Sequence, residues 1–212
     1  VQPFLGKAEI GMFLNAKRYK KENVEHAAAK GLNFLRVGAD AGDAEKYTEV
    51  IKTVKEAGLI CRYSLMKAYI LTPEKLAEEA KKLEAMGVDE MTIMDSAGCM
   101  LPDEVKEYVK ALKAAVKIPI GFHCHNNLGM SAANALAAMR SGVDVLDCGL
   151  LGMARSAGNL ATEVATALAK KYGEAPEVDF YGLLDFLEKE LIPAMETHGY
   201  KTAITPMELI LG

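Results

Sequence analysis

The sequence has few cysteines and no long apolar run. Its four cysteines, at positions 61, 99, 124 and 148, form no C-x-x-C pair, and there is no signal-peptide pattern. This usage predicts a reduced, cytoplasmic setting. Three of the four lie in or next to apolar runs and should pack as small buried hydrophobic groups. Every apolar run is shorter than the ~20 residues that a membrane-spanning helix needs, so we expect no membrane partner.

A large excess of charge of one sign is also missing. There are 25 Lys and Arg residues against 29 Asp and Glu residues, which gives a formal net charge of −4. This balance provides no general attraction to nucleic acid or to anionic membranes. With 50% hydrophobic and 25% charged residues among 212, the composition is typical of a globular domain and excludes disorder, collagen and coiled coil.

The sequence does contain a repeat. Six short β-rich runs start 25 to 31 residues apart, and stretches with helical periodicity lie between them. The runs cover residues 8–14, 34–39, 59–66, 90–95, 118–123 and 143–150. A strand followed by a helix, repeated six times, predicts an α/β fold with a parallel sheet covered by helices.

The junctions between these elements follow one design. A glycine ends each of four predicted helices, where a left-handed backbone residue is needed, and an apolar residue then opens the next strand. These glycines are Gly31, Gly58, Gly87 and Gly142. Proline marks two helix starts, at Thr72-Pro73 and Leu101-Pro102, because the first turn of a helix tolerates it.

Two architectures fit this pattern, an open doubly wound sheet and a closed (β/α)₈ barrel. A barrel has about 250 residues, so six units fit a TIM barrel that lacks its first two units. The N-terminus favours the barrel, since the chain starts without Met close to a strand-like run. The chain also stops inside an apolar pattern. We expect a partial TIM-barrel catalytic domain over residues 1–175 and the start of a truncated C-terminal helical region over 176–212. Its apolar stripe between Phe180 and Leu191 should pack against a core.

In both architectures ligands bind at the carboxyl ends of the strands, so the polar residues there are the candidates. They include Asn15, Asp40, Lys67, the pair Asp95-Ser96 and the run His123-Cys124-His125. Residues i and i+2 of a strand project from one face, so His123 and His125 can together bind one divalent metal ion. Cys124 should point the other way into the core, while His26 and His198 should be solvated.

Two loops beside this pair leave alternatives open. Asp95 can be a metal ligand, a base or a cap of the following helix, and the hydroxyl of Ser96 suits a carboxylate. Asn159 ends a glycine-containing loop over residues 149–159, and it can cap the next helix or turn its carbonyl oxygen toward a metal. That loop lacks the lysine of a P-loop and the spacing of a dinucleotide fingerprint.

A long ordered motif carries a family resemblance. The run Gly-Phe-His-Cys-His-Asn-Asn-Leu-Gly over 121–129 is followed by Gly142-Val143-Asp144 and Ala157-Gly158-Asn159. This series resembles the metal-dependent aldolase/lyase TIM-barrel superfamily, which includes hydroxymethylglutaryl-CoA lyase, isopropylmalate and homocitrate synthases and the carboxyltransferase domain of pyruvate carboxylase. Within it, the turn Asp95-Ser96-Ala97-Gly98 and the tail over 179–212 look most like the 4-hydroxy-2-oxovalerate aldolase family.

The resemblance implies a carbon–carbon lyase that cleaves a 4-hydroxy-2-oxoacid to pyruvate and an aldehyde, in aromatic catabolism in the cytoplasm. It implies that His123, His125 and Asn159 bind a divalent ion, Mn²⁺ first and Mg²⁺ or Co²⁺ as options. It also implies that Ser96 and His123 contact the substrate. An acylating aldehyde dehydrogenase is the implied partner, and a homo-oligomer is an option.

The sequence departs from that family where the acid/base chemistry should lie. The family's Leu-Arg-Asp-Gly motif supplies a metal-binding Asp, a substrate-binding Arg and, just beyond it, a catalytic His, and it has no match here. The segment Leu35-Arg36-Val37-Gly38 lacks the Asp and aligns with a later strand. The family's C-terminal Tyr and its dehydrogenase-docking helices have no match either. We therefore assign no catalytic acid/base residue and expect the 212-residue chain alone to be inactive.

Two alternatives to the aldolase stay open. One is a Claisen-type acyl-CoA lyase or synthase built on the same barrel. The other is a non-catalytic remnant of the barrel that pairs its open sheet edges with another chain, since open edges are a hazard for a lone monomer.

Overall fold

The computed structural model describes residues 6–175 and 177–200, and it divides the chain into two compact units. The first unit comprises Val1–Met94, Glu107–Gly121 and Gly142–Val145, and the second comprises Asp95–Lys106, Phe122–Ser141 and Leu146–Gly212. The family-like tail over 205–212 lies outside the described residues. The expected domain boundary after residue 175 stays a prediction.

All six expected strands are present, and they are hydrogen-bonded in chain order. They are β1 (Gly11–Asn15), β2 (Phe34–Asp40), β3 (Ile60–Met66), β4 (Glu90–Asp95), β5 (Ile120–Cys124) and β6 (Val145–Asp147). The pairs from β1 to β4 are parallel. A doubly wound sheet reverses its strand order at a switch point, whereas a barrel adds each strand beside the last. The order therefore favours six βα units of a barrel over the open sheet.

Two strands have shorter bounds than the sequence predicts. β1 begins at Gly11, because the amide N–H of Ile10 donates to the side chain of Asn33 (2.9 Å) instead of joining the ladder. β6 ends at Asp147, and the chain then enters the turn η5 (Leu150–Gly152), in which Leu151 has a φ of +54°. The remaining strand bounds agree with the prediction to within two residues.

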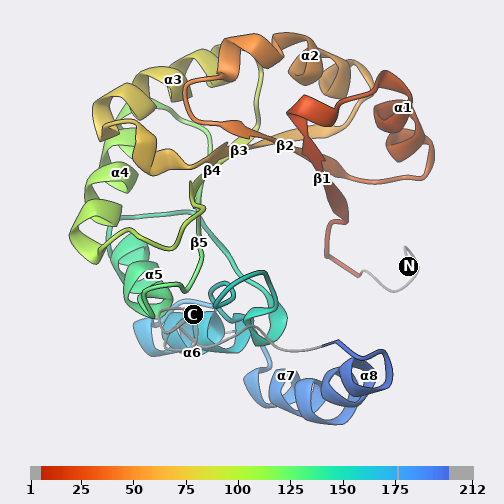
Figure 1. Cartoon of the computed structure of the whole chain (residues 1–212), viewed down its shortest axis with the longest axis vertical. Helices are drawn as coiled ribbons and strands as arrows, with labels where there is room; N and C mark the ends of the chain where they lie inside the picture. The colour runs from red at the N-terminus through yellow and green to blue at the C-terminus, as the bar shows by residue number, and fades with distance from the viewer. Residues whose placement is uncertain (1–5, 176, 201–212) are drawn as a thin grey trace. The chain divides into compact units, whose positions relative to one another are not determined.

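Helices and short 3₁₀ turns follow the strands. They are η2 (Ala16–Arg18), α1 (Lys21–Ala29), η3 (Ala44–Tyr47), α2 (Thr48–Glu56), η4 (Ala68–Ile70), α3 (Pro73–Ala85), α4 (Pro102–Ala115) and α5 (Ser131–Arg140). In the first unit, α1, α2 and α3 lie along one side of the strands β1 to β4 (Figure 1).

The predicted helix ends are confirmed. All four junction glycines have positive φ, at +75° for Gly31, +76° for Gly58, +92° for Gly87 and +84° for Gly142. At the start of α3, the side chain of Thr72 accepts a bond from the backbone N–H of Lys75, and Pro73 occupies the first turn. The glycines and the Thr-Pro pair in the sequence thus predict correctly where these helices end and begin.

Up to residue 200, where the described part of the second unit ends, its last elements are helices. They are α6 (Thr162–Tyr172), α7 (Phe180–Phe186), the π-helical segment η6 (Leu187–Leu191) and α8 (Ile192–Thr197). Of the expected apolar stripe, Leu187 is buried but Leu184 is 37% exposed, so the stripe packs only in part. Over residues 6–175 and 177–200, no helix has the length and apolar character needed to cross a membrane.

Candidate metal and substrate site

The histidine pair lies at the end of strand β5, in the part of the chain that belongs to the second unit. His123 lies in β5 and His125 follows its end, and both side chains are largely buried. Their ring centroids are 5.3 Å apart, and the ring planes meet at 78°. The i and i+2 positions thus bring the two imidazoles together, as the alternation of a strand predicts. Cys124 between them is fully buried, and its Sγ lies 3.7 Å from the carbonyl oxygen of Ser131, so it packs in the core as expected.

A carboxylate on the neighbouring strand holds the first histidine. The Nδ1 of His123 lies 3.1 Å from Oδ2 of Asp147, the last residue of β6. A carboxylate on one ring nitrogen fixes the tautomer and the orientation of an imidazole, and it leaves the other nitrogen for a ligand. Sequence reasoning did not assign Asp147 this contact. The predicted strand over 143–150 placed Asp147 inside the strand, so the available signal was its place in the family-like motif between Asp144 and Asn159.

The second histidine is fixed by its backbone. The amide N–H of His125 donates to the carbonyl oxygen of Asp95 (3.2 Å), and His125 forms an isolated antiparallel bridge with Asn159. Its Nδ1 is buried and has no hydrogen-bond partner among the described residues. Burial, followed by the nearby His123 and Arg155, lowers the pKa of His125 to about 4. The ring is therefore neutral near pH 7, which is the form in which histidine binds metals.

Asn159 provides a third candidate metal ligand, its side-chain oxygen. Helix α6 begins at Thr162 after a non-capping Ala161, so Asn159 does not cap it. Its side-chain Oδ1 is buried and has no partner among the described residues. The backbone N–H of Asn159 donates to Gly152 (3.0 Å), which holds the loop closed. Of the two roles that the sequence leaves open for Asn159, helix capping is wrong. The other role, in which its side-chain oxygen binds a metal, stays a prediction.

Asp95 has a structural role. Its side chain is fully buried, and its two oxygens accept bonds from the backbone N–H groups of Cys99 and Met100, each at 3.0 Å. Both oxygens of Asp95 therefore hold the turn that follows β4. Of the three roles that the sequence left open for Asp95, this one corresponds to the cap. Cys99 in this turn is exposed, unlike Cys61 and Cys124, which are buried as expected.

The turn after β4 packs closely on the histidine loop. A side chain at Gly98 would lie 2.6 Å from the carbonyl oxygen of His125, and Gly98 has a φ of +60°, so only glycine fits there. The side-chain Nδ2 of Asn127 donates to Ala97 (2.9 Å), and Arg155 donates to the carbonyl oxygen of Ser96 (2.8 Å). Ser96 is half-buried. Its contact with a substrate stays a prediction.

The side chains of His123, His125 and Asn159 are of the types that bind a divalent cation. Two buried atoms without a partner, on His125 and Asn159, lie in a loop system anchored beside the Asp147-oriented ring of His123. Unpartnered polar atoms are costly in a protein interior unless a ligand uses them. Over the described part of the chain, no group of three or more His, Cys, Asp or Glu side chains is placed to hold a metal. The candidate ligand set therefore contains no carboxylate or thiolate and consists of two imidazoles and one amide oxygen.

The chain is similar to one family profile and to several curated proteins. The HMGL-like family profile matches residues 36–189. The 4-hydroxy-2-oxovalerate aldolase of Carboxydothermus hydrogenoformans is 37% identical over 195 residues, which are 92% of this chain and 58% of that protein. The aldolase of the same name from Moorella thermoacetica is 40% identical over 174 residues, which are 82% of this chain and 52% of that protein. The chain thus spans somewhat more than half the length of these curated relatives.

A solved structure gives the same picture of the fold. The HMG-CoA lyase of Brucella melitensis has a TM-score of 0.74 to this chain at 20% identity, and the match covers 83% of this chain and 70% of that chain. At this identity the similarity concerns the fold alone. It confirms the α/β barrel-type arrangement of six βα units that the sequence predicts.

Proposed function

The chain belongs to the HMGL-like family, and on that basis we propose that it carries the metal- and pyruvate-binding part of an aldolase site. The reaction breaks the C3–C4 bond of a 4-hydroxy-2-oxoacid and gives pyruvate and an aldehyde. The names of the relatives that are 37% and 40% identical support this activity.

One observation carries the proposal: the buried, unpartnered atoms of His125 and Asn159 accompany a His123 ring that Asp147 has already oriented. We assign a divalent ion to His123, His125 and Asn159, with Mn²⁺ ahead of Mg²⁺ and Co²⁺. When bound, such an ion polarises the 2-oxo group as a Lewis acid.

The remaining roles belong to the residues of the chain. Asp147 holds the imidazole of His123 in one orientation, so that its other nitrogen is presented without a loss of rotamer freedom. The buried Asp95 keeps the turn that bears Ser96 in place, and Ser96 is proposed to contact the substrate carboxylate together with His123. The acid/base group is assigned to the catalytic His just beyond the family's Leu-Arg-Asp-Gly motif, and this sequence does not contain that segment.

Partners and location follow from the same family membership. We propose a small 2-oxo acid as substrate and an acylating aldehyde dehydrogenase as protein partner, and a homo-oligomer stays a prediction. The net charge of −4 supports a small-molecule substrate over nucleic acid or an anionic membrane. Four free cysteines support a cytoplasmic location.

The test is pyruvate release from 4-hydroxy-2-oxovalerate with Mn²⁺ present, coupled to lactate dehydrogenase. It compares the 212-residue chain with a protein extended at the N-terminus by the upstream βα units that carry the family's Leu-Arg-Asp-Gly motif and the His beyond it. We expect turnover in the extended protein only, since general acid–base catalysis contributes about 10²–10⁴-fold and positioning adds to this. The His123→Ala variant of the extended protein should lose activity. Comparable rates in the short and extended proteins would contradict this assignment.

The same preparations test the Claisen-type alternative. Thioester turnover with an acyl-CoA, in the absence of pyruvate release, would favour that reaction over the aldolase. An extended protein that is inert toward both substrates would instead support a non-catalytic remnant.

A further inference from the structure

An exposed arginine belongs to the same loop of the second unit as Asn159, the loop over residues 149–159. The Nη2 of Arg155 donates to the backbone carbonyl oxygen of Ser96 at 2.8 Å. Ser96 lies in the turn after β4, and it is the residue proposed above to contact the substrate carboxylate. The bond therefore holds the guanidinium against the turn that bears this residue.

The charge of Arg155 also acts on the histidine pair. Burial first, then His123 and then Arg155 lower the pKa of His125 to about 4. Charges that influence a titratable group in this way lie close to it, because salt screens more distant ones. The guanidinium thus lies near His125 as well as against the turn after β4.

The backbone that follows Arg155 is held in place. Ser156 has a φ of +56°, which is rare for a residue other than glycine. The N–H of Ala157 donates to Oδ1 of Asn127 (3.2 Å). The N–H of Gly158 donates to the carbonyl oxygen of Arg155 (3.1 Å). Such conformations persist where the surrounding structure imposes them, and they concentrate at functional sites.

Arg155 has no acidic partner among the described residues. Its one side-chain hydrogen bond there goes to a backbone carbonyl oxygen, which is neutral and does not balance the positive charge. A guanidinium has five N–H donors, and the bond to Ser96 uses one of them. The other donors and the charge are therefore left for a ligand on the exposed side of the loop.

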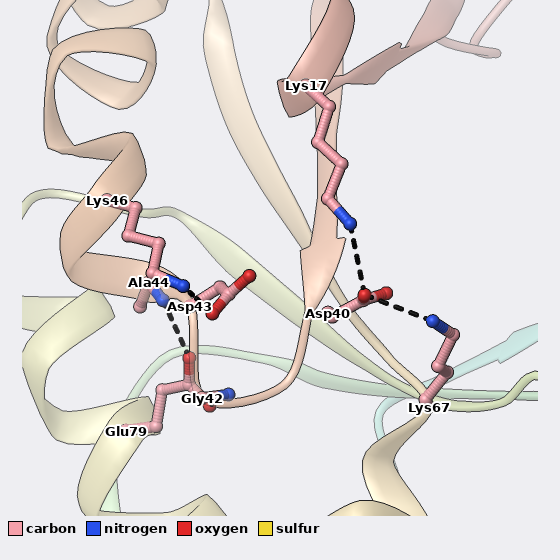
Figure 2. Close-up of polar contacts among 8 residues, drawn as sticks. All are labelled: Lys17, Asp40, Gly42, Asp43, Ala44, Lys46, Lys67 and Glu79. Carbon is pink, nitrogen blue, oxygen red and sulfur yellow. Dashed lines mark hydrogen bonds and ion pairs between the residues drawn. The ribbon is translucent and has the colours of Figure 1, made fainter.

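Two lysines at strand ends of the first unit show the opposite arrangement. The Nζ atoms of Lys17 and Lys67 lie 3.2 Å and 3.0 Å from one oxygen, Oδ2 of Asp40 (Figure 2). Their hydrogen bonds, that of Lys67 first, hold the pKa of Asp40 below its usual range. These three residues, the lysine cluster, thus form their ion pairs within the chain, whereas Arg155 forms none among the described residues.

A buried carboxylate anchors the loop after Asp40. Glu79 of α3 is 6% exposed, and its two oxygens accept the backbone N–H groups of Gly42 (2.6 Å) and Ala44 (2.9 Å) (Figure 2). The N–H of Asp43 in turn donates to the carbonyl oxygen of Asp40 (3.1 Å). Bonds within the first unit therefore account for the lysine cluster without a ligand.

We propose that Arg155 binds the carboxylate of the 2-oxo acid substrate, a role that rests on the proposed aldolase function and adds a residue to it. Arginine suits this ligand because its planar fork can donate two parallel bonds to one carboxylate. The bond to Ser96 holds the guanidinium in place before the substrate arrives, which reduces the entropy lost on binding. Arg155 binds the substrate and takes no part in proton transfer.

The alternative is a purely structural role, in which the bond to Ser96 only ties the loop to the turn after β4. Two substitutions separate these roles. Arg155→Gln keeps an N–H donor for the carbonyl oxygen but removes the charge. Arg155→Lys keeps the charge but removes the planar fork.

The test is titration of the 212-residue chain with pyruvate and with pyruvamide, in the presence of Mg²⁺ and at constant ionic strength, followed by amide NMR shifts. Pyruvamide has the same 2-oxo group but an uncharged amide in place of the carboxylate. We expect Arg155→Gln to bind pyruvate at least about tenfold more weakly, as charge-assisted bonds are lost, and pyruvamide as the wild type does. Arg155→Lys should recover part of the affinity for pyruvate.

The matched control is Arg140→Gln, which removes the same charge from an exposed arginine at the end of α5 in the second unit. It should bind both ligands like the wild type. An equal loss of pyruvate affinity in Arg140→Gln and Arg155→Gln would overturn the inference, because the effect would then be one of net charge.

Three further results would overturn it: a wild type that binds no pyruvate, pyruvate binding by Arg155→Gln equal to that of the wild type, or equal losses for pyruvate and pyruvamide. The last result would leave Arg155 the structural role alone. If Arg155→Gln does not fold, the same comparison of the two ligands in Arg155→Lys decides.

The failure of this inference and that of the aldolase proposal give different results. Equal pyruvate binding by the wild type and Arg155→Gln removes the role of Arg155 and leaves the aldolase standing. Pyruvate binding that depends on Arg155, without pyruvate release by the extended protein, supports the role of Arg155 and contradicts the aldolase.

Discussion

The two polar clusters of this chain contrast in charge, burial and pairing. In the second unit, His123, His125 and Asn159 present two imidazoles and one amide oxygen, and two of their buried atoms have no hydrogen-bond partner among the described residues. In the first unit, Lys17, Asp40 and Lys67 are charged, partly exposed and bonded to one another. Buried unpartnered atoms favour a ligand that they can coordinate, whereas charges that are already paired do not require one. The difference favours the second unit as the place where a ligand binds.

The two clusters are also supported differently. The histidine loop is held by backbone bonds, by the bridge to Asn159 and by the close contact of Gly98 with His125. The lysine cluster depends on Glu79, a single buried carboxylate on a helix. Substitutions should therefore affect ligand affinity in the second unit and local stability in the first, and the following predictions test that contrast.

The largest effect is expected at His125. His125→Ala should lower Mn²⁺ affinity by more than the ~10–100-fold typical of residues that only support a metal ligand, because it removes a ligand itself. Calorimetric titration measures this, with His26→Ala on the exposed face of α1 as the control. Unchanged Mn²⁺ binding in His125→Ala would mean that the histidine pair is structural.

A smaller loss is expected at Asp147. Asp147→Asn keeps the shape of the side chain but weakens the contact at 3.1 Å that orients His123. The Mn²⁺ affinity should fall about 10–100-fold, as for other groups that support a metal ligand. The same titration checks this value. A loss as large as that of His125→Ala would make Asp147 a ligand in its own right.

In the first unit we expect a change in stability. Both side-chain oxygens of Glu79 now accept a backbone N–H group. In Glu79→Gln only one oxygen can do so, and the new amide N–H₂ faces the other backbone N–H. A buried donor left unsatisfied costs about 1–3 kcal/mol, which denaturant midpoints can measure. The exposed Glu78 on the same helix is the matched site, and Glu78→Gln should change stability by less than about 0.5 kcal/mol. Equal effects at both positions would show that the anchor is unimportant.

The smallest effect belongs to the repeat that both units share. Gly87→Val should destabilise the chain by about 1–2 kcal/mol, because its φ of +92° disfavours a β-branched residue although no atom lies within 4 Å of an added Cβ. Gly142→Val should behave alike at φ +84°. Asparagine tolerates this conformation, so Gly87→Asn should cost less, and wild-type stability in both valine variants would contradict the junction design.

The sequence predicted the repeat well because it is local. Strand alternation, helix periodicity and the glycine junctions each depend on residues close in the chain, and so does the shared face of His123 and His125. The family resemblance supplied Asn159, whose bridge to His125 joins residues far apart in the sequence.

Long-range contacts set the limit of that prediction. Asp40 and Lys67 were visible as strand-end residues, but Lys17 joins them through the register of three strands and a 3₁₀ turn. Glu79 looked like one more acidic residue of an amphipathic helix, and only its burial against the loop after β2 shows otherwise. Asp147 could not be paired with His123 before the neighbouring strand was placed.

One NMR experiment tests the contrast between the clusters most directly. Mn²⁺ broadens the resonances of nuclei close to it. The account predicts that Mn²⁺ broadens the amides around His123, His125 and Asn159 and leaves those around Lys17, Asp40 and Lys67 sharp. Mn²⁺ broadening centred on Asp40 would contradict it.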